Sequence, residues 1–390
     1  MSKKNVAIIV QKLKGGGAER TAANLSMLLS SRYNVFLIVF DGTDIAYPYA
    51  GTLIDLKLPP TKSKSKKIPL GLKRIKAVKR IKKENHIDAS ISLLSGANLI
   101  NCMTRCGDKI ITSVRNQLSM SKNGSAIKRE IKFVSKRSDY VVALSKGVEE
   151  ELVNFFGVPS SKAVTIYNPV DGDVLRSKAS ECRDSAVISG SAITTMGRLV
   201  GQKGQWHLIR AMSEVVKTVS DAKLYILGQG DLKEMLIRLV SGLGLSENVE
   251  FLGFVEAPHS YIMNSQVFVF PSLYEGLGNV LLEAMACGVP CISTDCMSGP
   301  REILAPGTPV KQSLTDAEYA EYGVLVSVGD QGHYNASEPL TPAELQLASV
   351  IIRMLKDKEL HDRYVEKSLK RASDFSPEVI TDCWSDIIDI

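Results

Sequence analysis

The chain has no apolar run long enough to span a bilayer. Its longest runs, such as Val6–Val10 and Val35–Phe40, are of strand length, whereas a transmembrane helix needs about 20 apolar residues. The first ten residues, MSKKNVAIIV, pass directly into such a strand and lack the apolar core and cleavage site of a signal peptide. We therefore expect neither a membrane span nor secretion.

Cysteine is sparse and gives no sign of disulfides. The seven cysteines are an odd number and are scattered in apolar surroundings, which indicates a reducing, cytoplasmic setting. Cys287, Cys291 and Cys296 are close in sequence, but no second group of ligands accompanies them. We interpret these three as small buried hydrophobic residues rather than metal ligands.

A divalent-metal motif is also missing. No Asp-x-Asp pair follows a predicted strand, and Asp171-Gly172-Asp173, which has that spacing, falls in a predicted linker. Carboxylate pairs at strand ends are typical ligands of Mg²⁺. We expect no metal and no cofactor.

The N-terminal half is poor in acidic residues. Residues 1–185 contain 32 Lys and Arg but 16 Asp and Glu, whereas residues 186–390 contain 16 and 26. The densest patch, Lys57–Lys83, has 12 basic residues and no acidic one. Within it the spacing predicts a loop at Lys62–Lys67 and then an amphipathic helix over 70–81. Its apolar stripe is Leu72, Ile75, Val78 and Ile81.

This basic helix has two candidate partners and one simpler explanation. A basic face suits anionic lipid headgroups or a polyanion, and it can also be a solvated surface. No aromatic residue occurs between Tyr49 and Phe133, so nucleic-acid bases would find no side chain on which to stack. We favour an anionic membrane surface and expect no nucleic acid.

The order of predicted elements indicates an α/β protein of two domains. Apolar runs of strand length alternate with helical patterns, which is typical of parallel sheets covered by helices on both faces. A chain of 390 residues exceeds what one core usually supports. We predict an N-terminal domain over 1–170, a polar linker over 171–185, a C-terminal domain over 186–375, and a helix over 376–390 that packs back on the first domain.

Glutamates mark one strand–turn–helix unit, Tyr274–Pro290 (YEGLGNVLLEAMACGVP). Gln266–Ser272 reads as a buried strand, and the helical spacing begins after Gly278. Free amides at the helix start suit a phosphate or sugar, and the carboxylates of Glu275 and Glu283 can accept hydrogen bonds from vicinal hydroxyls. The same pattern also occurs in parallel α/β proteins without a ligand there.

The Glu275-x7-Glu283 segment resembles the signature of glycosyltransferase family 4. Three further segments match this family in the right order, over residues 6 to about 330. They are Gly15–Arg20 (GGGAER), Met196–Gly204 (MGRLVGQKG) and Ser298–Ile303 (SGPREI). The resemblance implies the GT-B fold: two Rossmann-like, doubly wound parallel-sheet domains that face a cleft. It also implies a retaining, metal-independent transferase that uses a nucleotide sugar.

The resemblance assigns roles to residues at the strand ends. Arg198 and Lys203 would hold the donor diphosphate, where fixed cations can stabilise the charge of the leaving group. With Glu275, which would bind donor-sugar hydroxyls, they form the expected catalytic set, and Glu283 would bind the ribose. The remaining donor-binding positions are Gly16, Gly17, Gly228, Phe254, Val255, Gly276, Leu277, Gly278, Asn279 and Val280.

One position departs from the family. Many members have a histidine after the strand that resembles Ile110–Ser113, where this chain has Arg115 and Asn116. Neither is a general base at neutral pH, since arginine stays protonated. The departure suits a route in which the departing phosphate takes the acceptor proton, with Arg115 and Asn116 on the acceptor and donor-sugar side.

We therefore expect a retaining enzyme that moves a hexose or N-acetylhexosamine from a UDP-sugar to a lipid-linked saccharide. The resemblance to this family implies an acceptor carried on undecaprenyl diphosphate, in capsule or O-antigen assembly at the cytoplasmic face of the cell membrane. A nucleotide-sugar epimerase of the same fold remains an alternative, although we find no acid–base pair for it. A basic nucleic-acid-binding protein is a further alternative.

Overall fold

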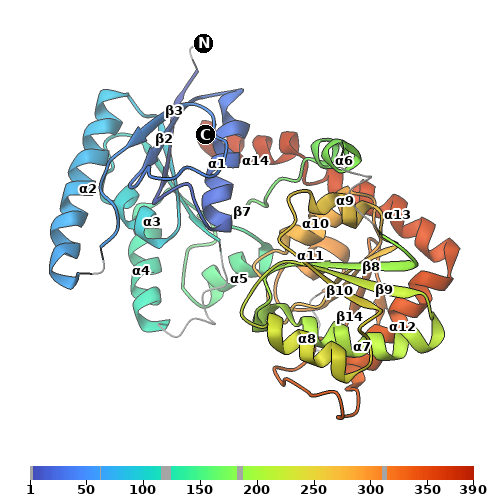
Figure 1. The fold of residues 1–390 in the computed structure, drawn as a ribbon. Helices are drawn as coiled ribbons and strands as arrows, with labels where there is room; N and C mark the ends of the chain where they lie inside the picture. Colours follow the sequence, from blue (N-terminus) through green and yellow to red (C-terminus); the bar gives the residue numbers. More distant parts are fainter. Residues whose placement is uncertain (1–2, 62, 116–123, 182–187, 310–313) are drawn as a thin grey trace. The chain divides into compact units, whose positions relative to one another are not determined.

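The computed structural model describes residues 3–61, 63–115, 124–181, 188–309 and 314–390. They form two compact units. The first unit combines Met1–Asn168 with Pro377–Ile390, and the second is Pro169–Ser376. In each unit, helices cover both faces of a central sheet (Figure 1).

The first unit contains a seven-stranded parallel sheet of order β3-β2-β1-β4-β5-β6-β7. Its strands are β1 (Asn5–Val10), β2 (Asn34–Val39), β3 (Thr52–Asp55), β4 (Ala89–Leu93), β5 (Lys109–Val114), β6 (Tyr140–Ala143) and β7 (Ala163–Thr165). Its helices are α1 (Gly17–Ser30), α2 (Lys64–Glu84), α3 (Ser95–Cys102), α4 (Gly124–Arg137), α5 (Lys146–Asn154) and α14 (Pro377–Asp389).

The alternation of side chains along β1 explains why helices are needed on both faces. Val6, Ile8 and Val10 pack in the cluster that contains residues of α1 and α14. Ala7 and Ile9 point the other way, into a cluster with α2 and α3. Successive side chains of a strand face opposite sides, so a strand buried on both faces is continuously apolar.

Helix α14 belongs to the first unit although it follows the second unit in sequence. Four of its residues lie in the apolar cluster of β1 and α1: Ile380, Trp384, Ile387 and Ile388. Two polar contacts support this packing, Arg32 with Asp382 at 2.6 Å and the Tyr33 hydroxyl with Asp389 at 2.8 Å.

Helix α2 differs from the sequence prediction in two respects. It begins at Lys64, so part of the segment expected as a loop is helical. Lys82, expected on the basic face, is buried instead: its ammonium group lies 2.7 Å from Asp108 Oδ2, 2.6 Å from Asn101 Oδ1 and 3.0 Å from Ser90 Oγ. Burial lowers the pKa of Lys82, and the neighbouring Asp108 opposes this shift.

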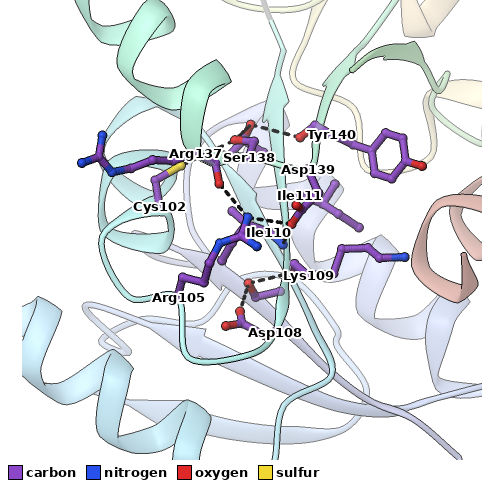
Figure 2. Close-up of polar contacts among 12 residues, drawn as sticks. Cys102, Arg105, Asp108, Lys109, Ile110, Ile111, Arg137, Ser138, Asp139 and Tyr140 are labelled. Carbon is purple, nitrogen blue, oxygen red and sulfur yellow. Dashed lines mark hydrogen bonds and ion pairs between the residues drawn. The ribbon is translucent and has the colours of Figure 1, made fainter. Parts of the chain in front are cut away.

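The amino ends of β5 and β6 are tied together by a second polar cluster (Figure 2). Arg105 donates to the Arg137 carbonyl and to Asp139, both at 2.8 Å, and Asp139 accepts from the Ile110 amide at 2.7 Å. These contacts lie at the sheet edge opposite the one where ligands of such folds bind. We assign them a structural role.

The second unit contains a seven-stranded sheet of order β10-β9-β8-β11-β12-β14-β13, parallel except for β13. Its strands are β8 (Ser191–Met196), β9 (Ala222–Leu227), β10 (Val249–Gly253), β11 (Val267–Phe270), β12 (Cys291–Thr294), β13 (Glu318–Tyr319) and β14 (Val324–Val326). Its α-helices are α6 (Gly172–Glu181), α7 (Gln205–Thr218), α8 (Lys233–Gly242), α9 (Pro258–Met263), α10 (Asn279–Ala286), α11 (Pro300–Leu304), α12 (Pro342–Lys356) and α13 (Lys358–Ser373).

The segment expected as a linker is largely helical. Gly172–Glu181 forms α6, which belongs to the second unit and packs against α9 and α10. Arg176 fixes it there by donating to the Ala286 carbonyl at 2.6 Å. The polar composition that suggested a linker is instead that of a surface helix with one buried residue, Ala179.

Within the described residues, every helix is too short or too polar to traverse a lipid bilayer.

Candidate functional site

The turn between β11 and α10 places the two glutamates at the carboxyl edge of the second sheet. Gly278 ends this turn with φ +90°, in the left-handed region, and a Cβ there would lie 3.0 Å from the Phe270 ring. Only glycine fits this conformation without strain. The turn therefore holds Glu275 near the end of β11. Helix α10 begins directly after Gly278, at Asn279, so Glu283 lies in the middle of this helix.

Glu275 is buried and paired with Lys203. Its Oε1 lies 2.5 Å from Lys203 Nζ, and the ammonium group also lies 5.1 Å from the centre of the Phe270 ring. The Glu275 backbone is fixed as well, because its amide donates to the Met297 carbonyl at 2.9 Å. Sequence reasoning placed both side chains at the donor, but it did not show that they form an ion pair.

Arg198 lies after β8 and is exposed. Over the part of the chain that the structure describes, its guanidinium has no hydrogen-bond or ion-pair partner, so this cation is available for a ligand. The strand ends around it approach closely, since a Cβ on Gly228 would lie 2.0 Å from the Gly197 carbonyl oxygen. Gly228 is therefore required by the packing of the β8 and β9 ends, whether or not it also contacts a ligand.

Glu283 pairs with a residue that the sequence analysis did not identify. Its Oε2 lies 3.0 Å from Nε2 of His259, at the start of α9. Both side chains are partly buried. No motif marks His259, which is 24 residues away in sequence; only the packing of α9 beside α10 brings the pair together.

The end of β10 and the residues that follow it contain two of the predicted donor-binding positions, Phe254 and Val255. Gly253 has φ +69°, Val255 is partly buried in an apolar cluster, and Phe254 is 79 % exposed. A ring this exposed can stack on a flat ligand.

In the first unit, the predicted donor-binding glycines Gly16 and Gly17 lie at the start of α1. Gly16 is the N-cap and has no side chain with which to cap the helix. The carboxylate of Glu19 in the first turn lies against Gly16, since a Cβ there would be 2.3 Å from Glu19 Oε2, so an anion that binds the first amides of α1 would have to displace it.

Arg115 follows β5 and is buried. It donates to Ser113 Oγ at 3.4 Å and to the side-chain oxygen of Asn168. Burial lowers its pKa to about 10, which leaves it protonated at neutral pH. Asn116 lies outside the described residues.

The described residues contain no group of three His, Cys, Asp or Glu side chains placed to hold a metal ion. Cys287, Cys291 and Cys296 are buried. Burial raises the pKa of all three thiols, that of Cys287 to about 12, so they remain protonated and apolar in character.

Comparison with known proteins identifies the class. Residues 189–322 match the family of group 1 glycosyl transferases, and residues 15–174 match glycosyltransferase family 4. An Anabaena protein, HepE, crystallised with UDP, shares the fold with a TM-score of 0.76 and 18 % identity, covering 99 % of both chains. The fold is thus GT-B, with two Rossmann-like domains, as predicted.

Two relatives extend the comparison. An uncharacterised glycosyltransferase of Methanocaldococcus jannaschii is 33 % identical over 318 residues, or 78 % of each chain. A Campylobacter jejuni enzyme is 29 % identical over 381 residues, or 95 % of each chain. It is named N-acetylgalactosamine-N,N'-diacetylbacillosaminyl-diphospho-undecaprenol 4-alpha-N-acetylgalactosaminyltransferase. The chain belongs to the family 4 type glycosyltransferases and is an enzyme of the transferase class, which confirms the resemblance.

Proposed function

We propose that this enzyme is a retaining transferase that moves a hexose or N-acetylhexosamine from a UDP-sugar to a hydroxyl of a lipid-linked saccharide. The observation that carries the proposal is the Lys203–Glu275 pair at the carboxyl edge of the second sheet. Arg198, which has no side-chain partner among the described residues, follows a strand at the same edge. In this arrangement the Lys203 cation can bind the diphosphate of a nucleotide sugar, and the Glu275 carboxylate can bind the hydroxyls of its sugar.

The chemistry follows from these charges. The bond between the sugar C1 and the diphosphate oxygen breaks, and negative charge builds on the leaving nucleoside diphosphate. Arg198 and Lys203 would stabilise this charge, the task that a metal ion performs elsewhere. Glu275 would accept from sugar hydroxyls and still keep Lys203, since a carboxylate has about four acceptor sites.

The acceptor proton needs no protein base in this scheme. As the acceptor oxygen bonds to C1 on the face that the diphosphate leaves, its proton passes to a diphosphate oxygen, and the configuration at C1 is retained. Arg115 stays protonated and would add positive charge on the acceptor side. No metal ion or cofactor takes part.

The acceptor class is inferred from the relatives. The name of the Campylobacter enzyme specifies an α-linked product and a diphospho-undecaprenol acceptor, and its match extends over nearly the whole chain. A sugar carried on undecaprenyl diphosphate is therefore the acceptor we propose, in bacterial surface polysaccharide assembly such as lipopolysaccharide or capsule.

The basic side of α2 supports a location at the inner face of the cell membrane. Lys73, Lys76, Lys79 and Lys83 are exposed. Two apolar residues near the start of this helix are exposed as well, Ile68 by 76 % and Leu72 by 62 %. Exposed lysines beside exposed apolar side chains suit an anionic lipid surface.

A two-stage experiment tests the proposal. UDP-sugars are first screened for a rise in the unfolding temperature, and each ligand found is then incubated with undecaprenyl-diphosphate-linked saccharides. We expect free UDP to appear only when both substrates are present. Conversion of the UDP-sugar without an acceptor would instead indicate an epimerase, and the absence of any nucleotide-sugar binding would overturn the proposed donor site.

A further inference from the structure

The hydrogen bond between His259 and Glu283 has no role in the chemistry described above. An ionised carboxylate only accepts hydrogen bonds, so the 3.0 Å contact assigns the hydrogen to Nε2 of His259. Elsewhere in the described residues, neither Nδ1 of His259 nor Oε1 of Glu283 has a hydrogen-bond partner. One carboxylate oxygen of Glu283 is thus held, and the other is free.

The elements around the pair hold it in place. His259 is in the first turn of α9, Glu283 is in the middle of α10, and α6 packs against both helices. The bond from Arg176 of α6 to the Ala286 carbonyl, at 2.6 Å, ends on α10 one turn after Glu283. A glutamate has three side-chain torsions, and on a helix surface its carboxylate is otherwise free to turn.

We infer that His259 is a positioning residue, which orients the Glu283 carboxylate to accept hydrogen bonds from the 2′- and 3′-hydroxyls of a bound nucleoside diphosphate. This inference rests on the proposed function, because it takes the ribose as the ligand of Glu283. His259 acts through Glu283 and not on the reacting atoms. His259 therefore contributes to the binding of the ribose and not to cleavage of the bond between the sugar C1 and the diphosphate oxygen.

The test measures discrimination rather than activity. Dissociation constants for UDP and for 2′,3′-dideoxyuridine diphosphate are determined by titration calorimetry with the full-length chain. The variants are His259→Leu, which removes the hydrogen-bond donor to Glu283, and His259→Gln, whose side-chain amide can still donate a hydrogen bond. His361→Leu is the matched control, because His361 also contacts a carboxylate, Asp362, but on α13. The unfolding temperature of each variant checks its fold.

We expect the wild-type protein to bind UDP at least about tenfold more tightly than the dideoxy nucleotide, since the latter leaves a carboxylate without its partners. In His259→Leu, the ratio of the two dissociation constants should fall by roughly fivefold. This fall should come from weaker binding of UDP, while the affinity for the dideoxy nucleotide should change by less than about twofold. His259→Gln and His361→Leu should keep most of the ratio. A variant that loses affinity for both nucleotides alike would show a merely structural role.

The possible failures are distinguishable. If the wild-type protein discriminates and His259→Leu discriminates equally well, the inference about His259 is wrong and the proposed function stands. If the wild-type protein binds UDP without discriminating, Glu283 does not bind the ribose, and the inference fails with that assignment. A protein that binds no nucleoside diphosphate overturns the proposed function itself.

Discussion

Lys203 and Glu275 are 72 residues apart in sequence and meet at 2.5 Å in a partly buried setting. Each charge is held by the other as long as no ligand is present. An anionic diphosphate would offer Lys203 a second partner, while the remaining acceptor sites of Glu275 would take sugar hydroxyls. The pair therefore keeps both groups close to the positions that the proposed chemistry requires, which reduces the cost of ordering them upon binding.

Removing either donor-phosphate cation should nearly abolish transfer. We expect Arg198→Ala and Lys203→Ala each to cost about 3 kcal/mol or more in transition-state stabilisation, the scale of losing one oxyanion donor. The measurement is kcat/KM for sugar transfer. Lys217→Ala is the control, because Lys217 is exposed and paired with Glu214. Turnover at the wild-type rate in either site variant would remove that residue from the site.

A second residue-scale prediction concerns the buried Lys82. The change Lys82→Met leaves Asp108 buried without its cation, so the free energy of unfolding should fall by about 3 kcal/mol or more. Lys79→Met, one turn away and exposed, should change it by less than about 0.5 kcal/mol. Urea denaturation measures both values. Equal losses in the two variants would contradict the structural role of the buried pair.

Single residues also show where prediction from sequence stops. The glycines and Glu275 could be predicted because a motif of fixed spacing carries them. His259 and the burial of Lys82 could not, because each depends on a partner that is supplied by another element through packing, Glu283 in one case and Asp108 in the other. The position of Lys82, four residues after the buried Val78, places it on the packed face of α2, but nothing in the local sequence shows that Asp108 is there to pair with it.

At the scale of elements, strands were predictable where burial on both faces made them continuously apolar. The strand expected at Gln266–Ser272, for example, is observed at Val267–Phe270, within the predicted range. Thr52–Asp55 and Ala163–Thr165 lie at the two edges of the first sheet, are short, and have exposed or half-buried residues. Edge strands of this kind lack the apolar run that identifies a strand. Helix α6 was missed because its polar surface resembles that of a linker.

The basic side of α2 gives an element-scale prediction. Changing Lys73, Lys76, Lys79 and Lys83 to Glu should release the protein from anionic liposomes, since each basic residue near such a surface contributes about 1 kcal/mol. Transfer to a short soluble acceptor should be nearly unchanged. The binding of the wild-type protein should weaken as salt is added. Liposome sedimentation measures the bound fraction.

A control variant with the same change in net charge tests whether the location of these lysines on α2, rather than their charge alone, determines binding to the liposomes. Lys217, Lys233, Lys356 and Lys370 are exposed on helices of the second unit, and replacing all four by Glu alters the net charge equally. This variant should remain bound to the liposomes. If both variants are released, overall charge rather than α2 governs binding, and if neither is released, α2 is a solvated surface.

For the whole molecule, we predict transfer that does not depend on a divalent metal ion. The proposed leaving-group charge is stabilised by Arg198 and Lys203, so enzyme treated with EDTA should keep its full rate. The rate of UDP release before and after chelation is the measurement. Loss of activity that is restored by Mg²⁺ or Mn²⁺ would show that the two cations are not sufficient.

The position of α14 has a consequence for biosynthesis. The ribosome completes residues up to Asn168 first, but the cluster of β1 and α1 lacks Trp384 and its neighbours until about 200 residues later. At about 5 to 20 residues per second this interval is roughly 10 to 40 s. During that time the apolar surface that α14 later covers is open to chaperones. The N-terminal half of the chain thus matures last, although it is made first.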